Sequence, residues 1–217
     1  MILEKDNFIV EYDQSISYIP EVVDFLETKM NNFMNFFELA SLKSKEKVVV
    51  FNDIEKYKKH LEKYTEYRDY MCADTYDGNI NLLSIEEAHK TKEHQNMTVN
   101  DLKLIILHEF VHICQKNCQV EKYNKTISWF WESLATNLGN PEKFSRITIE
   151  ATNEEINIFN TLPNNYPIAF TIGNYLLENY SHEDILNYVK YPSKLLADSE
   201  KILNEARKWS NQKNKTI

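Results

Sequence analysis

Two histidines one helical turn apart are the residues of this chain that are best placed to do chemistry. His108 and His112 stand four positions apart in the run "TVNDLKLIILHEFVHICQK". On an α-helix this spacing directs both imidazoles towards the same point in space, where they can bind one metal ion. Glu109 lies next to His108 and can reach that region without being a ligand. Two nitrogen ligands with a carboxylate beside them are typical of a zinc hydrolase.

The sequence around this HExxH motif is apolar. "LIIL" precedes the motif, and the residues between and after the histidines are Phe110, Val111, Ile113 and Cys114. We therefore expect the histidine pair to be buried, and a buried imidazole needs partners for its ring nitrogens. A shared metal ion would provide one partner for each ring, which favours zinc over the alternative of two paired core histidines.

A catalytic zinc ion needs a third protein ligand and one open position. The longer pattern HExxHxxGxxH does not continue here, because Gln115 replaces the glycine and Cys118 replaces the third histidine. A glutamate on a following helix is the other common choice, and Glu132 in "WFWESLA" follows His112 after 19 residues. A carboxylate in so apolar a segment is costly to bury without a partner. Glu132 is therefore the predicted third ligand, with an ordinary surface glutamate as the alternative.

An HExxH motif followed by W-x-x-E-x-x-A resembles the gluzincin branch of the zinc metallopeptidases, the group of thermolysin and the membrane-alanyl-type aminopeptidases. The order of expected elements is most similar to the small peptidase-MA-like domains. The resemblance is specific over residues 105–138, and it implies that His108, His112 and Glu132 bind Zn²⁺. It also implies that Glu109 is the general base. The implied fold is zincin-like and α+β, with an N-terminal mixed-sheet lobe, a C-terminal helical lobe and an active-site cleft between them.

The resemblance also extends to residues outside the motif. Enzymes of this group stabilise the oxyanion with a Tyr or a His, and the candidate here is Tyr166 in "NNYPIAF", with Tyr175 and His182 behind it. Thr136 stands where thermolysin-like enzymes have an aspartate that orients a zinc histidine. The segment "GNINLLS" lacks the glutamate with which aminopeptidases of this clan hold a free amine, so we do not expect N-terminal trimming.

The elements before the motif predict a mixture of strands and helices. "NFIVEYD" and "KVVVFND" are typical of strands, and the helical period behind Pro20 predicts a helix between them. "IEKYKKHLEKYTEYRDY" predicts a charged helix, and "GNINLLS" a strand whose edge would bind an extended substrate. Ser84 and Glu87 suggest a capping box for "IEEAHKTKEH", and Thr98 a cap for the motif helix. The remaining histidines of this half, expected to be solvated, are His60, His89 and His94.

After the motif the chain is predicted to be helical. The expected helices are "ISWFWESLATNLGNP", "YPIAFTIGNYLLENY", "HEDILNYVK" and "SKLLADSEKILNEARKWSNQ". "RITIEATNEEINIFNTLPNN" is ambiguous and expected to be partly loop. We therefore predict an N-terminal α/β lobe over residues 1–117, which ends in the HExxH helix. A C-terminal helical lobe over residues 118–217 would carry the third zinc ligand.

Composition excludes several classes of protein. A net charge of −8 disfavours nucleic acid as a partner, and three glycines leave no glycine-rich phosphate loop. Three cysteines without a CxxC pair argue for a reducing compartment. No stretch approaches the roughly 18 apolar residues that a membrane span needs, and the chain starts without an apolar leader. We therefore expect a cytoplasmic protein with no membrane partner, and the sequence carries no signal for an oligomeric state.

The leading prediction is a zinc metallopeptidase that hydrolyses peptide bonds in a peptide or protein substrate, with Glu109 as general base. One alternative is a regulatory protease resembling the ImmA type, although "ESLATNL" matches its E-x-x-A-x-x-F-A-like segment poorly. The other alternative is a non-catalytic zincin-fold module that binds peptide or protein. Glu109 favours an enzyme, because a binding module has no use for a base beside the metal.

Overall fold

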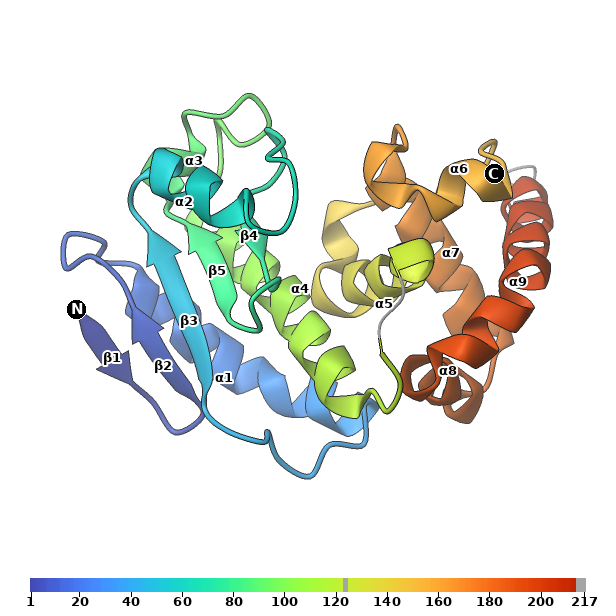
Figure 1. The fold of residues 1–217 in the computed structure, drawn as a ribbon, viewed down its shortest axis with the longest axis horizontal. Coiled ribbons are helices and arrows are strands. Elements are labelled where there is room, and N and C mark those ends of the chain that lie inside the picture. The colour runs from blue at the N-terminus through green and yellow to red at the C-terminus, as the bar shows by residue number, and fades with distance from the viewer. Residues whose placement is uncertain (123–124, 214–217) are drawn as a thin grey trace. The chain divides into compact units, whose positions relative to one another are not determined.

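The computed structural model describes residues 1–122 and 125–213. Within these residues the chain is α+β, as predicted, with one five-stranded sheet and nine α-helices (Figure 1). The chain divides into two compact units, Met1–Cys114 and Gln115–Ile217. This division falls within helix α4, Val99–Cys118, which also contains the boundary expected from the sequence.

The sheet of the first unit is mixed, in the order β1-β2-β3-β5-β4. Its inner strands β2, β3 and β5 run parallel, and the edge strands β1 and β4 are antiparallel to their neighbours. The predicted strands are present, whereas the two short edge strands were not predicted. The strands are β1 (Ile2–Glu4), β2 (Phe8–Glu11), β3 (Glu46–Phe51), β4 (Ala73–Asp74) and β5 (Ile80–Leu83).

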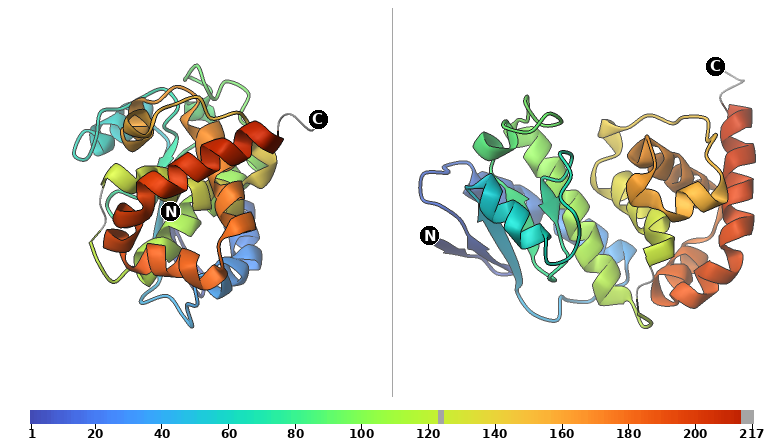
Figure 2. Two further views of the ribbon diagram at one scale, coloured as in Figure 1. Left: turned by 90° about the vertical axis from the view of Figure 1, so that its right-hand side faces the viewer. Right: turned by 45° about the horizontal axis from the view of Figure 1, so that its top comes forward.

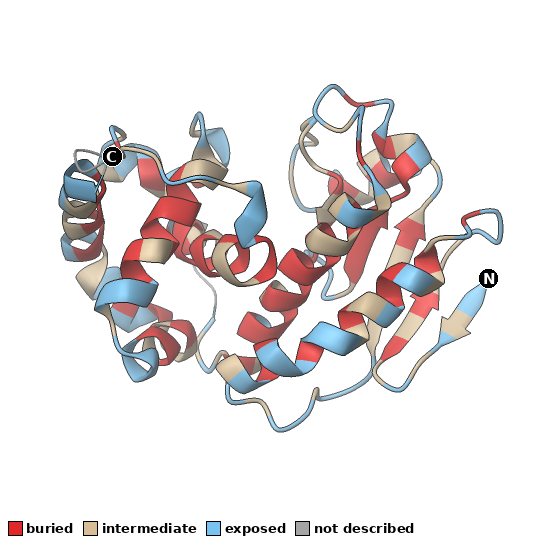
Figure 3. Ribbon diagram, turned by 180° about the vertical axis from the view of Figure 1, so that it is seen from behind, coloured by how far each residue is buried: buried red, intermediate tan, exposed pale blue. Residues whose placement is uncertain are grey.

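Helices α1 and α4 cover one face of this sheet (Figures 1 and 3). α1, Ile19–Phe36, connects β2 to β3 and has a proline in its first turn, as predicted. Phe110 of α4 packs edge-on against Phe8 of β2, with ring centroids 5.9 Å apart. It also contacts Phe33 of α1 at 6.2 Å. The motif helix is therefore held in the hydrophobic core of the first unit, which limits its freedom to move.

Strand β5 is an interior strand, so the predicted substrate-binding edge was wrong. β4 pairs with it in the register Ala73 with Leu82 and Asp74 with Asn81. The N–H of Leu83 also donates to the carbonyl of Cys72 at 2.8 Å. The backbone groups of β5 on that side are therefore bonded to the chain itself. The sequence did not reveal the pairing of β4 with β5, because β4 has only two residues, too few to show a strand pattern.

Two helices of the first unit are shorter than predicted. α2 comprises only Ile54–Leu61, and Asp53 caps it by accepting the N–H groups of Glu55 and Lys56. It ends where the N–H groups of Lys63 and Tyr64 bond to carbonyls three residues back, a tightened turn typical of helix ends.

α3, Ile85–Ala88, has only half of the predicted capping box. Ser84 accepts the N–H of Glu87 at 3.4 Å, as predicted. The carboxylate of Glu87 instead accepts the N–H of Ile54, which belongs to α2. Glu87 therefore connects two helices and does not complete the cap of its own helix.

The second unit is helical, as predicted (Figure 2). α5 packs most extensively against α7, and both α7 and α8 pack against α9. The ambiguous segment forms one short helix and a single 3-10 turn within irregular chain. None of the helices in the described ranges combines the length and the apolar character needed to cross a bilayer. The helices are α5 (Ser128–Gly139), α6 (Asn153–Asn157), α7 (Asn165–Asn179), α8 (His182–Lys190) and α9 (Pro192–Lys213).

Candidate metal centre

The motif helix begins at a well-formed cap. The hydroxyl of Thr98 accepts the N–H of Asp101 at 3.2 Å, and the Asp101 carboxylate accepts the N–H of Thr98 at 2.8 Å. These reciprocal bonds satisfy two of the N–H groups that a helix start leaves without intrahelical partners. The negative charge of Asp101 also suits the positive end of the helix dipole. The start of α4 is thereby fixed, which sets the rotation of the residues that follow.

His108 and His112 lie together on one side of α4. Their ring centroids are 4.9 Å apart, and the ring planes are inclined by 84°. His108 is 7% exposed and His112 is half-buried. The predicted burial is thus confirmed for His108, while His112 retains some access to solvent. The pair has the geometry that successive helical turns provide, and it fits two ligands of one ion.

Glu109 is buried beside this pair, with 8% of its surface exposed. Its charge acts on Tyr57 of α2, a fully buried residue. Burial is the main cause that raises the pKa of Tyr57, and the charges of Asp74, Cys72 and Glu109 raise it further. Tyr57 therefore keeps its proton, and its hydroxyl remains a neutral donor in the surroundings of Glu109.

The predicted third ligand, Glu132, lies on α5 and is half-buried. It belongs to the second unit, whereas His108 and His112 belong to the first. Two imidazoles and a carboxylate are the ligands of the His₂Glu class of catalytic zinc sites. The three residue types that the sequence predicts as ligands thus fit zinc.

Thr136 uses its hydroxyl within its own helix. It donates to the carbonyl of Glu132 at 2.7 Å and lies 3.2 Å from the carbonyl of Ser133. Such bonds to a carbonyl one turn earlier are common for threonine inside helices. The hydroxyl proton of Thr136 is therefore bonded to the backbone carbonyl of Glu132, the predicted ligand.

Tyr166 lies in an aromatic cluster of the second unit. Its ring stacks on Phe144 with centroids 5.9 Å apart and planes at 10°, and Phe159 meets it nearly perpendicularly at 6.1 Å. The N–H of Tyr166 donates to the side chain of Asn165 in the first turn of α7. These contacts fix the position of the Tyr166 ring. The role of Tyr166 in stabilising the oxyanion stays a prediction.

The two reserve candidates for the oxyanion have different surroundings. The hydroxyl of Tyr175 donates to Glu205 at 2.8 Å, and this bond ties α7 to α9. Burial, followed by that bond, raises the pKa of Tyr175. His182 is the first residue of α8 and is exposed. Tyr175 therefore has a clear structural role in the helical unit.

The expectation that the other three histidines of the first unit are solvated was wrong for His60, whereas His89 is exposed and His94 half-buried. His89 and His94 bond through Nε2 to the carbonyls of Met97 and Tyr70, at 2.8 and 2.9 Å. The side chain of His60 is only 10% exposed, and its Nε2 lies 3.3 Å from Asp74. Charged neighbours in the sequence misled the interpretation, because α2 ends at Leu61 and its last turn faces the β4–β5 hairpin.

This hairpin contributes a group of ligating side chains that the sequence interpretation missed. His60, Asp74 and Asp77 each place one ligand atom within 4.8 Å of the others. The signal available in the sequence was "DTYDG", in which two aspartates precede a glycine that favours a turn. Nothing local in the sequence links this segment to a histidine 14 residues before its first aspartate.

Comparison with known proteins adds no family assignment. No family model matches the chain, and no curated protein matches it. The resemblance to gluzincins therefore remains a hypothesis that rests on the motif and on the downstream glutamate.

Proposed function

We propose that this protein is a zinc metallopeptidase of the zincin-like fold. In this proposal His108, His112 and Glu132 hold the ion, and Glu109 is the general base. The observation that carries the proposal is the buried Glu109 beside two imidazoles that share one side of α4. A carboxylate in such a position has no evident packing role, since it is polar and lies in an apolar core.

The donor set supports zinc among the common ions. Ca²⁺ and Mg²⁺ prefer oxygen ligands, whereas zinc is commonly bound by imidazole nitrogen together with carboxylate. When bound, zinc supplies Lewis acidity, which polarises a carbonyl group and makes water a stronger acid. His108 and His112, on a rigid helix, would hold two positions, and Glu132 would complete the protein ligands.

Glu109 moves the proton in the proposed reaction. The carboxylate takes a proton from the attacking water as the new bond between oxygen and the peptide carbon forms. It returns that proton to the peptide nitrogen as the carbon–nitrogen bond breaks, so the leaving group departs as a neutral amine.

We also propose that the protein works in a reducing compartment, the cytoplasm. All three cysteines, Cys72, Cys114 and Cys118, are buried thiols. Chains that fold in oxidising compartments more often join such residues in disulfides.

The decisive experiment compares the parent with Glu109→Gln in two assays. A digest of a mixed peptide library should show cleavage by the parent and a loss of at least about 10²-fold in the variant. Elemental analysis should show the same zinc content in both, because Glu109 is not a ligand. Glu93→Gln, which makes the same change at an exposed position, is the matched control and should cleave like the parent.

Two results would overturn the proposal. One is a Glu109→Gln variant that cleaves as well as the parent. The other is a parent that holds zinc at α4 and cleaves nothing across a broad library, which would identify a peptide-binding module instead.

A further inference from the structure

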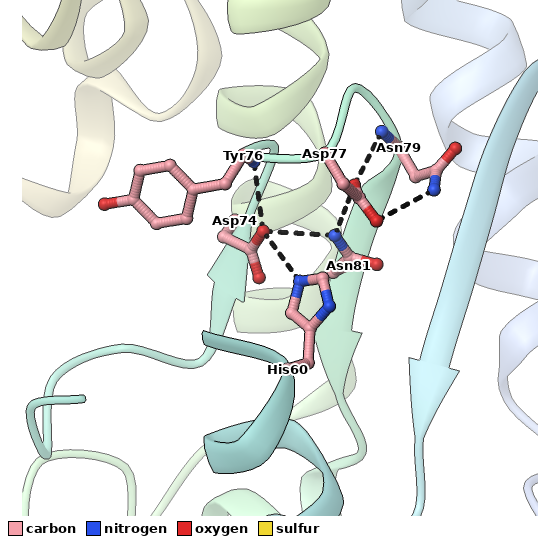
Figure 4. A network of polar contacts seen from close by, with 6 residues as sticks. All are labelled: His60, Asp74, Tyr76, Asp77, Asn79 and Asn81. Atoms are coloured by element: carbon pink, nitrogen blue, oxygen red, sulfur yellow. Dashed lines mark hydrogen bonds and ion pairs between the residues drawn. The ribbon is translucent and has the colours of Figure 1, made fainter. Parts of the chain in front are cut away.

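A second group of metal-ligating side chains lies within the first unit and uses elements other than α4 (Figure 4). His60 comes from the last turn of α2, Asp74 from strand β4, and Asp77 from the turn between β4 and β5. One ligand atom of each lies within 4.8 Å of the others. Two segments that are separate in the sequence, the end of α2 and the β4–β5 hairpin, therefore place one nitrogen and two carboxylate ligands together.

The Asp74 carboxylate is firmly held through one of its oxygens. Oδ1 accepts the N–H of Tyr76 at 3.1 Å and the side-chain amide of Asn81 at 3.1 Å. The same oxygen lies 3.3 Å from Nε2 of His60. Two N–H donors thus converge on a single atom, with the His60 nitrogen beside it, and they fix the carboxylate before any ligand arrives.

The other oxygen of Asp74 has no such partners. Oδ2 is buried, and within residues 1–122 and 125–213 it has no hydrogen-bond partner, although the side chain is only 3% exposed. Figure 4 shows this oxygen beside the ring of His60. Burial of a carboxylate oxygen without a partner is unfavourable. The arrangement therefore points to a ligand that the polypeptide does not itself provide.

A second buried polar atom near Asp74 is also unsatisfied. The hydroxyl of Tyr57 is fully buried and has no hydrogen-bond partner in the described part of the chain. After burial, the charge of Asp74 and a side-chain hydrogen bond with Asp74 are among the causes that raise the pKa of Tyr57. The hydroxyl of Tyr57 therefore lies near the Asp74 carboxylate, although neither it nor Asp74 Oδ2 has a hydrogen bond of good geometry among the residues that the structure describes.

Asp77 is presented by the turn of the hairpin. Its Oδ1 accepts the backbone N–H of Asn79 and the side-chain amide of Asn81, both at 2.9 Å. Gly78 has a φ of +88°, a conformation that side chains disfavour, and it permits this turn. The amide nitrogen of Asn81 thus donates to both carboxylates. The amide is neutral, so it does not balance the two negative charges as a bound cation would.

We propose that His60, Asp74 and Asp77 form a second site for a divalent transition-metal ion, with Zn²⁺ as the preferred occupant. Two carboxylates balance the charge of a divalent ion. The imidazole selects zinc over Ca²⁺ and Mg²⁺, which prefer ligand sets made of oxygen alone. The amide of Asn81 can offer its oxygen instead of its nitrogen after rotation, and so become a fourth ligand. An ion here would tie α2 to the β4–β5 hairpin, and the site does not depend on the proposed peptidase activity.

The test uses the full chain with the α4 site removed. In a His108→Ala, His112→Ala double variant, equilibrium dialysis against buffered zinc followed by elemental analysis should find about one zinc per chain, against about two in the parent. Adding Asp77→Asn should weaken the remaining site at least tenfold. Asp77 is exposed, so this change leaves the core intact. Asp69→Asn makes the same charge change at an exposed position outside the group and should leave binding unchanged.

A thermal-shift assay with Asn81→Asp gives an independent readout. A third carboxylate would repel the other two without metal, so the Tm should fall below that of the parent. Added Zn²⁺ should then raise the Tm more than in the parent, and Ca²⁺ should raise it less than Zn²⁺ does. Failure of the double variant to bind zinc, or equal zinc binding after Asp77→Asn, would overturn the proposal. If the α4 site does not bind zinc and this one does, the parent should bind one zinc per chain, and Asp77→Asn should weaken that binding.

Discussion

The imidazole rings of His108 and His112 meet almost perpendicularly, with centroids 4.9 Å apart on successive turns of α4. This relationship places two nitrogen ligands on a helix whose start is capped and whose body is packed into the core. Ligands held on a rigid element lose little freedom when they bind an ion, so the pair should contribute strongly to metal affinity.

Replacement of one histidine should therefore largely abolish metal binding at α4. In an Asp77→Asn background, which weakens the other candidate site, His112→Ala should weaken zinc binding by at least about 10²-fold. Competition with a chromogenic chelator measures this affinity. Unchanged zinc affinity would show that the ion is held elsewhere. His182→Ala, at an exposed histidine, is the control and should leave the affinity unchanged.

Glu132 should behave as a ligand and Glu109 as a base. Glu132→Gln should weaken zinc binding and lower the Tm in the presence of zinc, because a bound ion stabilises the folded state. Its activity should fall with its metal content and recover partly at high zinc concentration. Glu109→Gln should show the opposite combination, with zinc retained and activity not restored by added zinc. The two variants would then be alike in a peptidase assay and different in a metal assay.

Gly173 should be essential to the packing of α7 on α5, the helix that carries Glu132. A Cβ at this position would lie 2.1 Å from the side-chain amide of Asn137 and 2.4 Å from the carbonyl of Ser133. The backbone oxygen cannot move aside without shifting the helix, so Gly173→Ala should lower the free energy of unfolding by about 1–3 kcal/mol. Urea denaturation measures the change. Leu177→Ala, at an exposed position of the same helix, should change it by less than about 0.5 kcal/mol.

The stability of the second unit should fall at alkaline pH in part through Tyr175. Its pKa in the folded chain is raised above the ordinary value of about 10, first by burial and then by the bond to Glu205. The folded state therefore binds this proton more tightly than the unfolded state does. The stabilisation is complete below about pH 10 and is lost as the pH rises through the folded pKa.

Tyr175→Phe removes this titration along with the hydrogen bond. At pH 7 the variant should have a lower Tm than the parent, because a hydrogen bond to a charged group is lost. Between pH 9 and pH 11, values chosen around an ordinary pKa of about 10, the Tm of the parent should fall more than that of the variant. Equal losses in the two proteins would show that Tyr175 does not contribute to the alkaline transition.

The sequence by itself determined the features that depend on residues close together in the chain. The histidine pair, Glu109 and the Thr98 cap are all set by spacings of one to four residues within one helix. Helical and strand periods likewise predicted α1, β2, β3 and four helices of the second unit, α5, α7, α8 and α9, because burial of one face imposes a regular pattern. Two predictions reach further along the chain, Glu132 from its apolar segment and Tyr166 from the family resemblance alone, and both roles remain predictions.

Tertiary structure alone decided the features that depend on which distant segments meet. β5 became an interior strand because β4, only two residues long, pairs along it. The Glu87 carboxylate accepts the N–H of Ile54 at the start of α2, and it does not complete the cap of α3. His60 meets Asp74 and Asp77 because α2 ends at Leu61 and the hairpin folds against its last turn. Such contacts arise from the packing of whole elements, so no local pattern of residue types could have predicted them.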